Sequence, residues 1–128
     1  TEAGTQGGVS LDLDTLTPVH WVGVVAALVS GAIHLVLGVG FLPSPFGVSF
    51  VLAGLGFAGA VALLVAGYRR RLLYGVGIPF TGIQIVLWYL VRVRGQGFPA
   101  FGEATLDYVD KGAQVLLIAV LAYLLAAE

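Results

Sequence analysis

The chain has 128 residues, of which 59% are hydrophobic and only 10% are charged. A soluble domain usually carries about 25% charged residues, so this composition indicates an integral membrane protein. The formal net charge of −1 offers no basic face to nucleic acid. The sequence contains no cysteine, which excludes disulfides, iron–sulfur clusters and thiolate metal sites within these residues.

Residues 1–17 are polar and acidic and precede the first apolar stretch. They lack the basic start of a secretory signal peptide, so we expect an acidic N-terminal tail that is disordered or forms a short surface segment. Residues 18–128 are then expected to form a single domain.

Four apolar stretches follow along the chain, each near the ~20 residues that cross ~30 Å of hydrocarbon. A spanning segment must satisfy its own backbone hydrogen bonds, so we expect helices. Thr17 and Pro18 suit the N-cap and the first position of the first helix. The predicted fold is an all-α bundle of four transmembrane helices, up-down-up-down, at residues 18–41, 48–67, 72–91 and 108–126.

Small residues recur along the predicted helices and let helices approach closely in lipid. The first helix carries Gly23, Ala27, Gly31 and Gly38 on or near one face. We expect this face to pack within the bundle or against another copy.

Basic residues flank the predicted spans and guide the orientation. Residues 69–71 lie on the same side as both termini, and the other side holds Arg92, Arg94 and Lys111. The compact arginine cluster favours cytoplasmic termini. The same cluster is a candidate site for anionic lipid headgroups, with Arg69, Arg70 and Arg71.

Four polar side chains interrupt the apolar helices at nearly one depth. His34 and Gln84 each lie seven residues before the end of their helix, and Gln114 lies six residues into the fourth. Asp110 is one turn from Gln114 on the same face. If the faces converge, they form a polar layer, defined here as His34, Gln84, Gln114 and Asp110. Such groups either hydrogen-bond the helices together or form the binding site of a small carrier.

The third helix carries a stripe that supports this convergence. Its members recur at steps of three and four residues, the spacing of one helical face: Tyr74, Gly77, Thr81, Gln84 and Trp88.

The two histidines raise a second possibility. His20 and His34 are 14 residues apart, so they share a face of one helix about 21 Å apart along its axis. Histidine is a natural axial ligand of haem iron, and the spacing is similar to that in the haem-bearing helices of b-type cytochromes. A homodimer would have to supply the second ligand of each iron, because no further histidine exists. Against haem, His20 beside Trp21 also suits an interfacial belt.

Three stretches carry a resemblance to a known group of proteins: VHWVGVVAALVSGAIHLVLG, AGYRRRLLYGVGIPFTGIQIVLWYL and YVDKGAQVLLIAVLAYL. Together they resemble a family of small, uncharacterised four-helix membrane proteins of haloarchaea, over most of residues 18–126. The resemblance implies a four-helix membrane fold. It implies no activity and assigns no site residues.

The leading functional hypothesis is a non-enzymatic membrane subunit without cofactor or metal. It associates with itself or with a larger membrane complex, a respiratory complex being one candidate, and its other partners are membrane lipids. The first alternative is an electron-transfer protein that binds haem b through His34 and His20. The second is a small carrier that uses the polar layer.

Overall fold

The computed structural model describes residues 12–95, 97–102 and 104–128. Four long α-helices account for most of them, and no strand occurs in this part of the chain. Each long helix, α4 being taken together with η2, is long and apolar enough to cross a membrane. These findings confirm the predicted all-α class and the four helices. The helices are α2 (Pro18–Gly40), α3 (Pro45–Val65), α4 (Arg70–Trp88) and α5 (Thr105–Ala127), with a 3-10 turn η1 (Leu13–Thr15) and a π-helix η2 (Tyr89–Val93).

The helix boundaries differ from the predicted ones by a few residues, and at the start of α3 a capping residue accounts for the difference. The sequence predicts a second helix from residue 48, but α3 begins at Pro45, because Ser44 Oγ accepts the Gly47 N–H at 3.1 Å. α5 begins three residues before the predicted start at residue 108. The predicted start of the first helix is confirmed. Thr17 N–H donates to His20 Nδ1 at 3.0 Å in a reciprocal cap.

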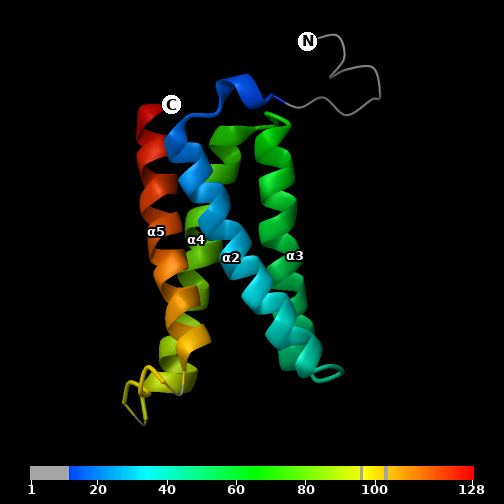
Figure 1. Cartoon of the computed structure of the whole chain (residues 1–128), viewed down its shortest axis with the longest axis vertical. Helices are drawn as coiled ribbons and strands as arrows, with labels where there is room; N and C mark the ends of the chain where they lie inside the picture. The colour runs from blue at the N-terminus through cyan, green and yellow to red at the C-terminus, as the bar shows by residue number, and fades with distance from the viewer. Residues whose placement is uncertain (1–11, 96, 103) are drawn as a thin grey trace.

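Consecutive helices run antiparallel, so the chain goes up and down through the bundle (Figure 1). The start of α2, the C-terminus and the α3–α4 turn lie at one end of the bundle, and the α2–α3 and α4–α5 connections lie at the other. α2 packs against α3 and α5, and α4 packs against α5, whereas α3 and α4 touch little. Among neighbouring helices of the bundle, α3 and α4 therefore have the least extensive contact.

Facing glycines bring α2 and α3 close together. A Cβ atom on Gly54 would lie 2.9 Å from the carbonyl oxygen of Gly31, and one on Gly38 would lie 3.0 Å from that of Gly47. Gly23 instead faces α5. The small face predicted on the first helix therefore packs within the bundle.

Residues 12–17, the last part of the predicted tail, contact the α3–α4 turn. Asp12 N–H donates to the Val65 carbonyl at 2.7 Å. The Arg70 guanidinium donates to the Asp12 carbonyl at 3.1 Å and to Thr15 Oγ1. The rest of the predicted tail, residues 1–11, lies outside the described residues.

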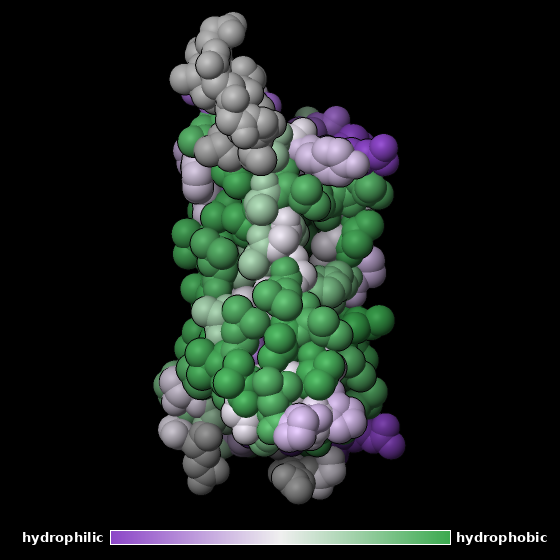
Figure 2. Space-filling model, turned by 90° about the vertical axis from the view of Figure 1, so that its right-hand side faces the viewer, coloured by the Kyte–Doolittle hydropathy of each residue, from purple (hydrophilic) through white to green (hydrophobic). Residues whose placement is uncertain are grey.

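The outer surface is apolar around the middle of the bundle. Figure 2 shows a broad hydrophobic band with hydrophilic residues gathered towards the two ends. Large side chains such as Val36 and Ile83 are more exposed than buried on this surface. Such a band is compatible with a hydrocarbon surrounding.

Candidate functional site

The structure brings all four residues of the polar layer together. Gln114 Nε2 donates to Gln84 Oε1 at 2.8 Å and joins α5 to α4. Ser30 Oγ donates to Asp110 Oδ1 at 2.5 Å and joins α2 to α5. His34 Nδ1 lies 2.8 Å from the Ser30 carbonyl oxygen and 3.7 Å from Asp110 Oδ1. The polar layer thus connects three of the four long helices.

Sequence patterns did not assign Ser30 and Lys111 to this cluster. Lys111 Nζ donates to Asp110 Oδ2 at 2.6 Å and to Gln114 Oε1 at 2.8 Å. Its side chain is only 13% exposed, although the sequence indicates a charge that flanks the span. Helical spacing could have identified both residues. Ser30 lies one turn before His34, and Lys111 lies three residues before Gln114, so each shares a helical face with a member of the layer.

Further polar contacts join the polar layer to the α4–α5 end of the bundle. Trp88 Nε1 donates to Asp107 Oδ2 at 2.8 Å, and Arg92 Nε lies 3.1 Å from the same oxygen. Lys111 Nζ lies 6.0 Å from the centre of the Trp88 ring, at the limit of a cation–π contact.

Gln84, Gln114, Asp110 and the Nδ1 atom of His34 have polar partners among the side chains of this cluster or in the nearby helix backbone. Gln84 Nε2 donates to the Phe80 carbonyl at 3.0 Å, and the His34 ring packs against Phe50 and Phe57, with ring centres 4.8 and 5.9 Å away. Within the described residues, the one buried side-chain polar atom without a partner is Thr81 Oγ1, which is not part of the layer. The geometry favours hydrogen bonding between helices over a carrier site.

His20 lies at the other end of α2 and is buried. Its Nε2 is 3.0 Å from both Tyr74 Oη and Glu128 Oε2, and Tyr74 Oη donates to the Glu128 carboxylate at 3.1 Å. The Nδ1 atom accepts the Thr17 N–H. Both ring nitrogens therefore already have partners within the chain.

The surroundings of His20 do not fit a haem in the single chain. An axial ligand needs a free imidazole nitrogen facing open space, which His20 lacks. The glycines that would admit a macrocycle are covered: a Cβ on Gly23 would lie 3.0 Å from Val120, and one on Gly31 would lie 3.2 Å from Phe57. For a metal ion bound by side chains alone, which is a separate question from haem, the described part of the chain contains no cluster of three or more histidine or carboxylate side chains.

The three arginines proposed to bind lipid headgroups differ in how much they bond to the protein itself around the α3–α4 turn. Arg70 Nε donates to the Leu64 carbonyl at 3.0 Å, and Arg71 donates to the Leu125 carbonyl at 2.9 Å. Arg69 is exposed and lies over the ring of Tyr68 at 5.5 Å. Arg69 and Arg71 are both exposed at this end of the bundle, whereas Arg70 is half-buried.

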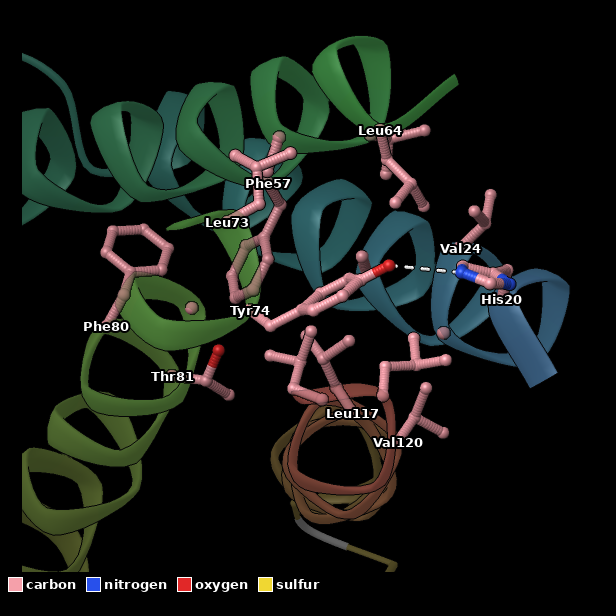
Figure 3. A pocket seen from close by; sticks show the side chains of 17 residues that line it. His20, Val24, Phe57, Leu64, Leu73, Tyr74, Phe80, Thr81, Leu117 and Val120 are labelled. Carbon is pink, nitrogen blue, oxygen red and sulfur yellow. Dashed lines mark hydrogen bonds between the residues drawn. The ribbon is translucent and has the colours of Figure 1, made fainter. Parts of the chain in front are cut away.

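A narrow apolar cavity of about 70 Å³ lies where all four helices meet, in the half of the bundle nearest the termini. Figure 3 shows Tyr74 and Phe57 around it and the Thr81 hydroxyl pointing into it. We call this space the central cavity. Its other labelled neighbours are His20, Val24, Leu64, Leu73, Phe80, Leu117 and Val120.

A second hollow, the outer groove, runs along the outside of the bundle between α2 and α5. Its volume is about 640 Å³ and its lining is almost wholly apolar. The small residues Ala26 and Ala113 belong to its lining, which is completed by Pro18, Trp21, Val22, Val25, Val29 and Leu116.

Comparison with known proteins and families identifies the family of this chain. Neither a curated protein nor a solved structure matches the chain. The model of a family of unknown function, DUF7475, matches residues 7–125, and the chain therefore belongs to that family.

Proposed function

We propose that this protein is a non-enzymatic, multi-pass membrane protein that acts as an oligomerising or accessory subunit of a membrane complex. The outer groove is the observation that carries the proposal. Helices associate in lipid through close packing, because lipid chains are as apolar as the helices themselves. A groove of about 640 Å³ that includes alanines on both α2 and α5 offers such packing to one apolar helix.

A second copy of this chain is the occupant that we propose for the outer groove. The lining carries no charged side chain, so its partner must be equally apolar. Val25 and Leu116 are exposed beside the groove and provide ridges on the same face. A face with both a ridge and a groove suits a two-fold dimer, in which each copy presents the same surface.

Cross-linking tests this dimer directly, because the chain has no cysteine of its own. Val25 is 60% exposed at the outer groove, and Val86 is 54% exposed on α4. We expect Val25→Cys to form a disulfide-linked dimer in native membranes under mild oxidation. The matched variant Val86→Cys should stay monomeric on the same gel. Equal cross-linking of both variants, or of neither, would contradict association through the outer groove.

The alternative functions receive less support from the contacts. The groups of the polar layer bond to one another, which favours a structural role over a carrier site. The occupied nitrogens of His20 weigh against haem b. Cytoplasmic termini and a haloarchaeal source belong to the same proposal. The first is supported by Arg69 to Arg71, which lie beside the end of α5, where Arg71 donates to the Leu125 carbonyl. The second is supported by the sequence resemblance alone.

A further inference from the structure

Thr81 is an exception in a bundle whose buried polar groups are paired. Its side chain is fully buried, and Thr81 Oγ1 has no hydrogen-bond partner among the described residues. An unpaired buried hydroxyl weakens a fold, because it loses its bonds to water and gains nothing in return. The hydroxyl points into the central cavity (Figure 3). A ligand in the cavity would supply the missing partner.

The shape of the central cavity limits what can enter it. Each helix lines the cavity over two turns: His20–Ala27, Phe57–Leu64, Tyr74–Thr81 and Leu117–Leu124. Two turns correspond to about 10 Å. A free volume of about 70 Å³ spread over this length is narrow. It fits a single hydrocarbon chain better than a flat ring system.

The route into the central cavity lies between α3 and α4, the pair of neighbouring helices with the least contact. Phe80 of α4 lines the cavity and is also 37% exposed on the outer surface. Ala60 of α3 is likewise both exposed and part of the lining. The Phe80 ring packs against Phe57 of α3, with ring centres 5.2 Å apart. A chain from the surrounding lipid can therefore enter sideways, without crossing the polar ends of the bundle, once this ring turns aside.

The polar group of the ligand follows from the lining. Tyr74 Oη and the His20 ring nitrogens are already bonded, which leaves the Thr81 hydroxyl as a free donor. A carbonyl oxygen accepts that bond and brings no donor of its own, whereas a ligand hydroxyl would add a second hydrogen that needs an acceptor. We propose that the central cavity binds one hydrocarbon tail of a lipophilic carbonyl compound, and that Thr81 Oγ1 donates a hydrogen bond to its carbonyl oxygen.

Two probes of equal length test this assignment on the full chain in lipid nanodiscs. Dinonyl ketone carries a carbonyl between two nine-carbon tails, and nonadecane is the matched alkane. We expect the wild type to bind the ketone more tightly than the alkane. Thr81→Val keeps the shape of the side chain and should weaken ketone binding roughly fivefold, which is the effect of one neutral hydrogen bond. Alkane binding should not change, and Thr81→Ser should restore ketone binding.

Spectroscopy and a blocking variant locate the bound probe. A carbon-13 label on the ketone carbonyl should show a hydrogen-bonded chemical shift in the wild type and lose it in Thr81→Val. Val61 lines the central cavity, so Val61→Phe should prevent binding of both probes. Leu55→Phe places the same ring on the exposed face of α3 and should have no effect. Equal affinity of the wild type for both probes, no binding of either, or binding that survives Val61→Phe would overturn the proposal.

Discussion

Replacing Asp110 by asparagine is expected to destabilise the bundle by about 3 kcal/mol, the usual penalty for breaking a buried ion pair. The carboxylate accepts bonds from Ser30 and Lys111 and lies 3.7 Å from His34 Nδ1. Asparagine keeps the volume but removes the charge, so Lys111 is left as a poorly hydrated cation. The free energy of unfolding, measured by titration with a denaturing detergent in mixed micelles, reports the loss.

A double variant separates two effects of Asp110→Asn on stability: the unpaired charge of Lys111 and the loss of the other contacts of the carboxylate. Lys111→Met removes the cation and keeps an unbranched side chain. In Asp110→Asn/Lys111→Met we expect most of the stability to return, because neither member of the pair is then left unpartnered. Asp107→Asn is the matched control. Its partner Arg92 has a side chain that is 51% exposed, so water can replace the lost contact. We expect this control to lose less than about 1 kcal/mol.

Two outcomes would contradict this account of Asp110. If Asp110→Asn and Asp107→Asn lost the same stability, the buried Asp110–Lys111 pair would contribute no more to the free energy of unfolding than the exposed pair does. If the double variant were no more stable than Asp110→Asn, the penalty would come from Ser30 and the helix contact rather than from the Lys111 charge.

Much of the fold could be predicted because membrane spans obey simple length and hydropathy rules. The same regularity placed the polar layer, since a fixed rise per residue turns a count from the helix end into a depth. His34 and Gln84 were counted back from the ends of their helices, and Gln114 was counted forward from the start of its helix. These counts predicted one depth in the membrane for all three residues, and in the structure they lie in one network. Lys111 was missed because it was assigned to the basic residues that flank the spans, although its neighbour Asp110 was placed in the polar layer.

The haem hypothesis and the central cavity show what spacing cannot reveal. A separation of 14 residues places His20 and His34 on one face of α2 but does not say what covers that face. Tyr74 and Glu128 hold one histidine, and Phe57 fills the space beside Gly31. A cavity forms where the side chains of four helices do not fill the space between them. It depends on how these side chains pack together, which the periodic pattern of one helix does not reveal.

Replacing Gly54 by alanine is expected to destabilise the bundle by about 2 kcal/mol, through overpacking between α2 and α3. The new Cβ atom would lie 2.7 Å from Leu35 Cγ and 2.9 Å from the carbonyl oxygen of Gly31. The leucine side chain can move, but the carbonyl belongs to the helix backbone. The two helices must therefore separate, which also loosens the neighbouring contact of Gly38 with Gly47.

Gly59 supplies the control, because it lies on the same helix and a Cβ atom there would meet nothing within 4 Å. Alanine loses less conformational freedom than glycine on entering a helix, so Gly59→Ala should raise stability by about 0.5 kcal/mol. The same detergent titration compares both variants with the wild type. A drop of similar size in both would mean that alanine disturbs α3 by itself. A drop in Gly54→Ala alone would show that the glycines set the distance between α2 and α3, the packing on which one wall of the central cavity depends.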